Sequence, residues 1–501
     1  MASCLSGCGF TDTTPLQVSF CRPQMTMTRL LPLGSPRVKL TASRGLLLSR
    51  PWTMHASLLL AQADPSNLLA ARLQMAITLG FHIVFACFGV GIPALVLLAE
   101  GMFLRSGDEG WRTLARRWSK VFAVLFAVGA VSGTVLSFEL GLLWPEFMGR
   151  FGSVIGLPFT LEGFAFFVEA IFVGIYSYGW NRLSPLAHWW SGVPIAVSGL
   201  ASAWFVVTAN AWMNAPQGFR LVDGAVVDVR PLTAMMNSAT WAQTTHMIIA
   251  AYMVSGFVVA SIYAVALLGG RTTLYHRRAL TLALLPAAAF APLQLAAGHW
   301  SAQVVSRTQP VKLAAMEGQF QTEKGAPLRI GGIPDEQQRV TRYAIEIPGG
   351  LSWLAYGDRQ ATVRGLDDFS PNDLPPVRVV HVAFQLMVAA GMLLLLVSLS
   401  IGWSLWRHRK IPTGRWFLTA VVACGPAAVL ALEAGWTVTE VGRQPWIVQG
   451  VLRTADAVTD APGVSWVVAA TLTIYGILAI GTLVVLRLLA RVPLPEAADG
   501  N

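Results

Sequence analysis

Long apolar runs separated by short polar segments make up most of this 501-residue chain. A helix needs about 20 apolar residues to cross a bilayer, and several runs reach that length. Because lipid offers the backbone no hydrogen-bond partners, such spans must be helical. The pattern therefore predicts an all-α polytopic membrane protein with about nine transmembrane helices. Their expected positions are roughly 74–98, 121–143, 158–180, 190–211, 246–269, 279–298, 379–405, 416–435 and 465–488.

The polar segments between these spans alternate in charge. Basic residues gather in 99–120, 270–278 and 406–415, whereas the intervening segments carry little or balanced charge. Because cytoplasmic loops are enriched in Lys and Arg, the first span is expected to start outside and the C-terminus to lie inside.

One external segment is much longer than the others. A loop of this length is more often a functional element than a linker. The chain accordingly divides into a leader at 1–53, helices one to six within 54–298, the external loop at 299–378, and helices seven to nine with a C-terminal tail at 379–501.

The chain carries a net charge of +10, and residues 1–53 supply half of it with six basic residues and one acidic residue. The remainder is ordinary for cytoplasmic membrane loops, so no nucleic-acid partner is expected. The first 53 residues are rich in Ser, Thr, Arg and Leu, which is typical of an organelle transit peptide. Alternatively, Met54 is the true start. The expected location is a bacterial plasma membrane, or an organelle membrane if the leader is a transit peptide.

Three ionisable residues lie at or near the outer end of the eighth apolar segment: Glu433, Glu440 and Arg443. Only 12% of the chain is charged. Charge at membrane depth is costly, so it usually marks a transport pathway, an ion pair or a cofactor site.

Carboxylates also occur within the second and third spans. Glu162 and Glu169 are two helical turns apart, so they face one side of the third span, about 10 Å apart along its axis. They could form a carboxylate relay across the bilayer or be two separate buried hydrogen-bonding groups. Glu139 in the second span is another candidate for a buried carboxylate.

Three histidines lie in or at predicted spans: His82, His246 and His381. Such a histidine either makes a structural hydrogen bond or serves haem ligation or proton transfer. His246 and Met387 each lie near the outer start of a span, at similar depth, and such a pair suits the axial positions of a low-spin haem. His82 and Glu440 could approach the same outer layer.

In the long external loop, residues 309–318 are expected to form a short amphipathic helix. Its Lys312 and Glu317 could bind a polar head group, or they could simply face solvent.

Together these segments resemble subunit I of the cytochrome bd-type quinol oxidases. The most specific matches are 312–317 (Lys-Leu-Ala-Ala-Met-Glu) and 442–446 (Gly-Arg-Gln-Pro-Trp). The other matching stretches are 71–76 with Phe81 and His82, 138–141, 161–169, 179–183, 209–213, 309–318, 332–335 and 433–446.

The resemblance implies haem ligands. His246 and Met387 match the axial pair of a low-spin b haem near the quinol site. His82 and Glu440 match the ligands of two high-spin haems where oxygen is reduced, and Trp436 matches a residue packed around them. The implied cofactors are two or three b haems, with haem d as the alternative for the third.

The resemblance also implies roles in proton transfer and quinol binding. Glu162 matches a carboxylate beside the oxygen-reducing haems, and Glu169 matches a deeper one on the cytoplasmic proton route. Lys312 and Glu317 match residues of the quinol loop, and Arg443 matches a residue packed around the haems. Quinol would be oxidised outside and oxygen reduced with cytoplasmic protons, which charges the membrane without pumping. The implied partners are a smaller membrane subunit II, quinol, dioxygen and the lipid bilayer.

The sequence departs from the family pattern at two positions. Gln385 stands where many members have Arg, which should lower the potential of the nearby haem, and Asn181 replaces a usual Asp. The short external loop and the run 137–145 resemble the cyanide-insensitive branch.

A secondary cation-coupled transporter with intramembrane carboxylates is the alternative. It would need no haem, so the colour of the purified protein separates the two hypotheses. A haem-copper oxidase or a bc-type cytochrome b would need clustered or paired histidines, which do not appear among the eight in the chain.

Overall fold

The computed structural model describes residues 65–494. The predicted leader at 1–53, with the choice between a transit peptide and a start at Met54, lies outside the described residues.

Within residues 65–494, nine helices are long and apolar enough to cross a membrane. The predicted helical membrane fold is therefore confirmed. The nine helices are α1 (Pro65–Ser106), α2 (Glu109–Leu143), α3 (Pro145–Gly179), α4 (Pro185–Asn214), α6 (Thr240–Leu268), α7 (Leu274–Thr308), α10 (Val377–His408), α11 (Arg415–Val441) and α12 (Val464–Arg491).

Several helices run beyond the apolar stretches that predicted them, because their ends are capped by polar residues outside the apolar core. Asp108 accepts a 2.8 Å hydrogen bond from the backbone N–H of Gly110 at the start of α2. Ser184 caps α4 in the same way, and Pro185 follows it at the first helical position. Proline suits this position because the backbone N–H that it lacks would have no intrahelical partner there. Hydropathy locates a membrane span but not the helical turns on either side of it.

The helices pack through small residues. On α6, a Cβ at Gly256 would lie 2.8 Å from the carbonyl oxygen of Ala283 on α7, and one at Gly425 of α11 would lie 2.4 Å from Ser261 Oγ of α6. Because lipid tails are as apolar as Leu, such close backbone approach is a main source of helix association in membranes.

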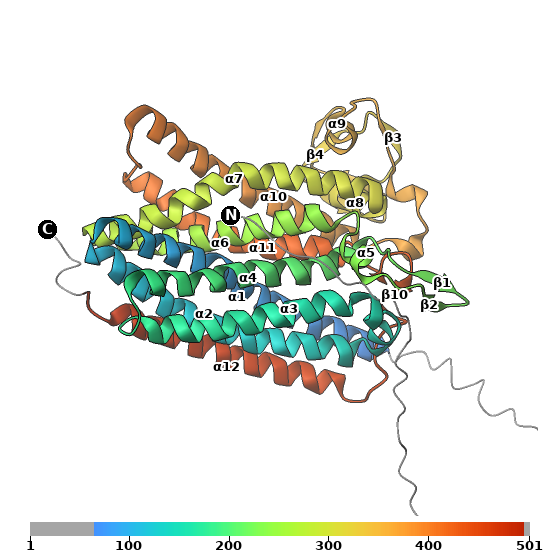
Figure 1. Ribbon diagram of the computed structural model, residues 1–501. Helices are drawn as coiled ribbons and strands as arrows, with labels where there is room; N and C mark the ends of the chain where they lie inside the picture. The colour runs from blue at the N-terminus through green and yellow to red at the C-terminus, as the bar shows by residue number, and fades with distance from the viewer. Residues whose placement is uncertain (1–64, 495–501) are drawn as a thin grey trace, which may run out of the picture. The chain divides into compact units, whose positions relative to one another are not determined.

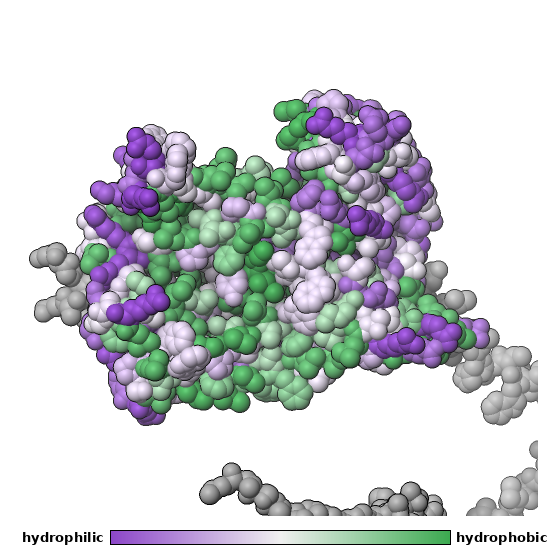
Figure 2. Space-filling model, turned by 45° about the horizontal axis from the view of Figure 1, so that its top comes forward, coloured by the Kyte–Doolittle hydropathy of each residue, from purple (hydrophilic) through white to green (hydrophobic). Residues whose placement is uncertain are grey.

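The long loop and the basic loops lie at opposite ends of the helical bundle, as Figure 1 shows. The segments after α1, α6 and α10 are at the left-hand end of this view, and the chain between α7 and α10 is at the right-hand end. Apolar side chains cover the middle of the face seen in Figure 2, and hydrophilic ones gather towards both ends.

The right-hand end carries short helices and two-stranded antiparallel sheets. The pairs are β1–β2, β3–β8, β4–β7, β5–β6 and β9–β10. These elements are α5 (Pro231–Met235), α8 (Pro310–Glu317), α9 (Gly350–Tyr356), β1 (Arg220–Val222), β2 (Ala225–Val227), β3 (Glu323–Lys324), β4 (Leu328–Ile330), β5 (Ile333–Asp335), β6 (Val340–Arg342), β7 (Ile345–Ile347), β8 (Thr362–Val363), β9 (Trp446–Val448) and β10 (Leu452–Arg453), with 3-10 turns at Leu366–Asp368 and Pro371–Asp373.

The expected short helix at 309–318 exists as α8, but it is not an amphipathic helix with a solvated face. All six of its residues from Lys312 onward are buried. The helix packs against α7 and α10. The solvent-facing alternative for Lys312 and Glu317 is therefore wrong, because neighbouring helices cover the side of α8 that its sequence would leave to water.

Candidate functional site

An ion pair lies at the C-terminal end of α11. Arg443 Nη2 is 2.5 Å from Glu440 Oε2, and Arg443 is only 3% exposed. Asn210 of α4 donates a hydrogen bond to the other oxygen of Glu440. The two other guanidinium nitrogens of Arg443, Nε and Nη1, have no hydrogen-bond partner among the described residues. Buried donors normally find an acceptor, so Arg443 has capacity for an anionic group beyond Glu440.

Lys312 of α8 lies beside this ion pair. Its ammonium group donates to Asn214 Oδ1 at 2.7 Å, to Gln309 Oε1 at 2.9 Å and to the backbone oxygen of Thr439 at 3.2 Å. Burial, and secondly the positive charge of Arg443, holds the pKa of Lys312 well below its ordinary value. The structure thus brings Lys312, Glu440 and Arg443 into one cluster, although the sequence assigned them to separate roles.

Glu317 ends α8 and is also buried. Burial raises the pKa of its carboxyl group to about 8, and the charge of Arg329 offsets this only in part. Its Oε2 makes no hydrogen bond within the described chain. Gly318 follows at φ +61, where a Cβ would lie 2.4 Å from Thr341 Oγ1. This glycine is required for the loop to turn directly behind Glu317.

His246 and Met387 come from two helices that both pack against α7 and α11. The His246 ring lies 3.2 Å from Gln294 Nε2. A Cβ at Gly298 would be 3.4 Å from its Cε1, and a Cβ at Gly435 would be 3.1 Å from Met387 Sδ. Each of the two candidate iron ligands therefore has a glycine against it.

His82 faces α2, where its Nδ1 lies 3.0 Å from Ser132 Oγ. A Cβ at Gly133 would be 2.9 Å from the His82 ring, so a third candidate ligand also lies beside a glycine. Glu433 lies against α1, where a Cβ at Gly80 would be 3.3 Å from its Oε2. The structure places His82 against Ser132 of α2 and Glu440 against Asn210 of α4.

Glu162 and Glu169 both face α4. Ser202 Oγ lies 3.4 Å from Glu162 Oε1, and a Cβ at Gly199 would be 3.4 Å from Glu169 Oε1. The two carboxylates thus occupy one face of α3, as their spacing implied. Glu139 is buried as expected, and its Oε1 accepts hydrogen bonds from Gln74 at 2.5 Å and Thr78 at 2.8 Å.

Gln385 and His381 tie the long loop to α10. Gln385 accepts a 3.0 Å hydrogen bond from the N–H of Gly331 and donates a 3.1 Å bond to the carbonyl oxygen of Arg329. The two ring nitrogens of His381 lie 2.8 Å from the Met316 oxygen and 3.2 Å from the Gly331 oxygen. Trp436 is half-buried on α11 and packs against the main hydrophobic core.

Sequence reasoning missed four buried polar residues. Asn214 bonds to Lys312, while Glu100, Tyr176 and His188 form a separate cluster at the other end of the bundle. A signal for Tyr176 was available, because it follows Glu169 by the same interval that separates Glu169 from Glu162.

The residues fit a haem. A flat macrocycle needs helices to approach an iron ligand without side chains in the way, and glycine supplies that room at His82, His246 and Met387. The imidazole and thioether donors suit haem iron. The unpartnered guanidinium nitrogens of Arg443 suit an anionic substituent.

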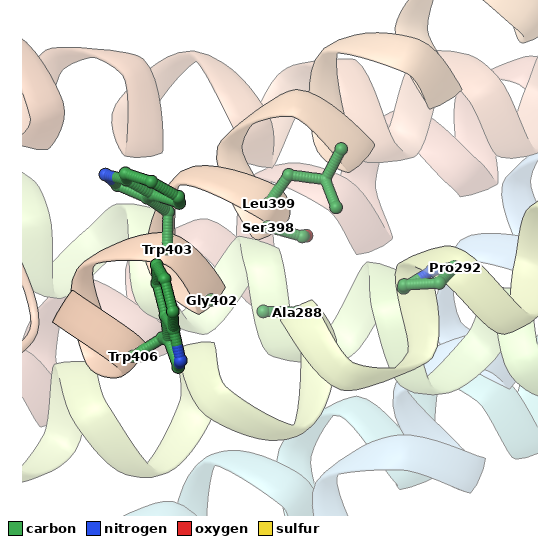
Figure 3. A pocket seen from close by; sticks show the side chains of 7 residues that line it. All are labelled: Ala288, Pro292, Ser398, Leu399, Gly402, Trp403 and Trp406. Carbon is green, nitrogen blue, oxygen red and sulfur yellow. The ribbon is translucent and has the colours of Figure 1, made fainter.

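A separate groove of about 610 Å³ lies between α7 and α10, outside this site. Figure 3 shows Trp403 and Trp406 at one end of it and Pro292 at the other. Its lining is almost wholly apolar, and none of the candidate site residues contributes to it.

Within residues 65–494, nine candidate membrane helices carry partly buried His and Met side chains and partly or fully buried carboxylates, an arrangement suited to a membrane-embedded oxidoreductase. The sequence profile described as "Cytochrome bd terminal oxidase subunit I" matches residues 70–493. The chain therefore belongs to the family of cytochrome bd terminal oxidase subunit I.

Individual relatives agree with this assignment. The chain is 38% identical to the "Putative cytochrome bd menaquinol oxidase subunit I" of Bacillus subtilis, over 78% of this chain and 89% of that protein. It is 29% identical to the "Cytochrome bd-II ubiquinol oxidase subunit 1" of Escherichia coli, over 77% of this chain and 88% of that protein. The structure of the bd oxidase from Geobacillus thermodenitrificans aligns with a TM-score of 0.80 and 39% identity, covering 85% of this chain and 99% of that chain.

Family membership confirms the resemblance noted from the sequence. It also confirms the enzyme class, a terminal quinol oxidase, and a multi-pass protein of a bacterial membrane. The family implies haem and a partner subunit. These matches support an oxidase rather than the cation-coupled transporter that the buried carboxylates had left open.

Proposed function

We propose that this chain carries the haems of a quinol oxidase that oxidises quinol at the outer face and reduces dioxygen to water with cytoplasmic protons. Electrons and protons then come from opposite sides, so turnover charges the membrane without pumping. The first span starts outside and the C-terminus lies inside. The observation that carries this proposal is the set of glycines facing His82, His246 and Met387.

In this proposal His246 and Met387 hold a low-spin b haem. His82 and Glu440 hold the irons of two further haems, and Trp436 packs beside them. Haem, when bound, supplies the redox and oxygen chemistry. Arg443 fixes the orientation of Glu440 through their 2.5 Å contact. The proposed cofactors are two or three b haems, with haem d as the alternative identity of the third.

Lys312 and Glu317 bind the quinol head group at opposite ends of α8. The three donors of the Lys312 ammonium group go to Asn214, Gln309 and the Thr439 oxygen, so quinol would replace one of these acceptors with its own oxygen. The Glu317 carboxyl group has a pKa of about 8. A group with a pKa this close to neutral can accept and release a proton during turnover. The loop around α8 is then the quinol loop, in the short form of the cyanide-insensitive branch.

Glu169 and Glu162 pass protons from the cytoplasmic side towards the oxygen-reducing site. Both carboxylates face α4, where Ser202 and Gly199 leave polar or open surface. The partner is a smaller membrane subunit II, and the substrates are quinol and dioxygen.

The deciding experiment is the dithionite-reduced minus oxidised absorption spectrum of the purified protein, together with pyridine haemochrome analysis. Haem b bands, with or without a far-red haem d band, are the expected result. A colourless protein that is folded and monodisperse would contradict the proposal.

The quinol role of Lys312 has its own test. Lys312→Met should raise the KM for quinol at least about tenfold, because the substrate loses a charged hydrogen-bond donor. The exposed Lys324, in the same loop, provides the matched control Lys324→Met. Equal KM values for the two variants would remove Lys312 from the quinol site.

A further inference from the structure

A second buried polar cluster lies near the end of the bundle that carries the basic loops. It consists of Glu100 on α1, Tyr176 on α3 and His188 on α4, which are 2%, 4% and 2% exposed. The Tyr176 hydroxyl donates to Glu100 Oε2 at 2.5 Å, and His188 Nδ1 lies 2.6 Å from Glu100 Oε1. The cluster therefore joins three helices through groups that can all exchange protons.

The geometry requires a shared proton in this cluster. His188 Nε2 lies 3.0 Å from the backbone oxygen of Tyr176, so Nε2 must carry a hydrogen. A carbonyl oxygen can only accept. The contact between Nδ1 and Glu100 then needs one more proton, held either by the imidazole or by the carboxyl group. The pair Glu100–His188 thus stores one proton between two atoms 2.6 Å apart.

The cluster is aligned with the two carboxylates of α3. Glu162, Glu169 and Tyr176 follow one another at intervals of seven residues. Seven residues are close to two turns, so the three side chains share a face and successive members are about 10 Å apart along the axis. That face meets α4 at all three residues. Glu162 contacts Ser202, and Glu169 lies by Gly199. The Tyr176 ring packs against the His188 ring, with ring centres 4.2 Å apart.

The interval between Tyr176 and Glu169 contains open polar space. Pro93 lies inside α1 and has no N–H, so the carbonyl oxygen of Gly89 lacks its helical partner. A Cβ at Gly199 would lie 3.4 Å from this oxygen and 3.4 Å from Glu169 Oε1. A Cβ at Gly89 itself would touch nothing within 4 Å.

A cavity of about 10 Å³ lies beside the Pro93 kink and is lined by Pro93, Ser119 and Tyr176 together with the apolar Val96, Phe122 and Ile195. A lining this apolar does not hold water by itself. The proposed route from Tyr176 to Glu169 therefore depends on their alignment on one face of α3 and on the open space at Gly89.

We propose that Glu100, His188 and Tyr176 form the proton-holding station that supplies Glu169 from the cytoplasmic side. The inference rests on the proposed function. Each transfer moves one proton from an oxygen or nitrogen atom to the next acceptor. The Glu100–His188 pair regains its proton from the cytoplasm, and no electron or other bond is involved. The alternative is a purely structural clamp between α1, α3 and α4.

The test uses the complete oxidase with its partner subunit. Glu100→Gln keeps the size and hydrogen-bonding capacity of the side chain but cannot ionise. It should lower quinol-dependent oxygen consumption at least about tenfold. The thermal unfolding temperature, the haem spectrum and the anaerobic rate of haem reduction by quinol should stay at wild-type values. Glu109→Gln is the matched control, since Glu109 is exposed at the same end of the bundle.

A second variant covers the case in which Glu100→Gln does not fold. Gly199→Ala fills the polar space beside Glu169 without touching the cluster, and it should slow oxygen consumption several-fold with an unchanged haem spectrum. If the folded variants consume oxygen at the wild-type rate, the station does not exist. If wild-type protein lacks haem and oxidase activity, the proposed function itself fails, so the two failures are distinguishable.

Discussion

The two ends of the bundle carry buried polar clusters that differ in how completely they are satisfied. In the cluster at the end with the basic loops, every polar side-chain atom of Glu100, Tyr176 and His188 has a protein partner. At the end with the long loop, Arg443 and Glu317 keep polar atoms with no partner in the described part of the chain. Buried unpaired groups are costly, so they are retained where a ligand supplies the missing contacts. This difference supports the proposals that the first end holds a proton and that the second end binds ligands.

Removing the carboxylate of the Glu440–Arg443 ion pair should have the largest effect. Glu440→Ala leaves Arg443 buried without its charged partner. In comparable buried pairs, removing one partner lowers the free energy of unfolding by about 3 kcal/mol. We expect a lower unfolding temperature in detergent and loss of haem. The control is Glu146→Ala, because Glu146 and Arg150 form an exposed pair. Such surface pairs contribute less than about 1 kcal/mol. Similar losses of unfolding temperature and haem in both variants would mean that the Glu440–Arg443 pair contributes no more than an exposed pair.

Adding a methyl group beside His82 should have the next largest effect. The Cβ of Gly133→Ala would lie 2.9 Å from the His82 ring, whereas that of Gly141→Ala on the same helix would meet nothing within 4 Å. Overpacking of this kind lowers the free energy of unfolding by about 1–3 kcal/mol. We expect Gly133→Ala to lose high-spin haem, measured as haem per polypeptide, and Gly141→Ala to retain it. Full haem content in both variants would place the haem elsewhere.

The pH dependence of stability should be more modest. The pKa of Glu317 is raised to about 8 from the model-compound value of 4.5. Between these values the native state holds a proton that the unfolded state has released, so stability falls as pH rises from 4.5 to 8. The slope is at most about 1.4 kcal/mol per pH unit. Glu317→Gln should flatten this dependence in thermal unfolding measured across the window. A variant with the same slope as wild type would show that another group titrates.

The smallest effect should follow from releasing the loop. Gln385→Ala removes the two hydrogen bonds to the backbone at Arg329 and Gly331, worth about 1 kcal/mol each at most. We expect a modest rise in the KM for quinol with unchanged haem content. Gln360→Ala, at an exposed position of the same loop, is the comparison variant. If both leave the KM unchanged, Gln385 does not position the quinol loop.

Much of the fold could be predicted from the sequence because membrane spans depend on length and hydropathy, which are local properties. The nine helices follow from them, and so does the shared face of Glu162 and Glu169. The starts of α2 and α4 could not be predicted from hydropathy, because the polar turns before their apolar cores are capped by Asp108 and Ser184. The burial of α8 was missed for a similar reason, since only its tertiary neighbours cover its polar side.

The candidate site could be predicted only one residue at a time. Lys312 and Glu440 are far apart in the chain, and their meeting depends on α8 folding back against α11. Glu100 and His188 were missed because each lies near the end of an apolar segment, where a charged residue is ordinary. Their burial and their 2.6 Å contact, which both depend on the tertiary structure, distinguish them from surface residues.

The seven-residue spacing along α3 restricts how this protein can change in evolution. Inserting or deleting one residue between Glu162 and Tyr176 would rotate one end of the stripe by about 100° relative to the other. One proton-carrying group would then turn towards lipid while the rest still faced α4. Point substitutions along the lipid side of α3 should be well tolerated, but its length between these two residues should be nearly fixed among relatives that keep the stripe.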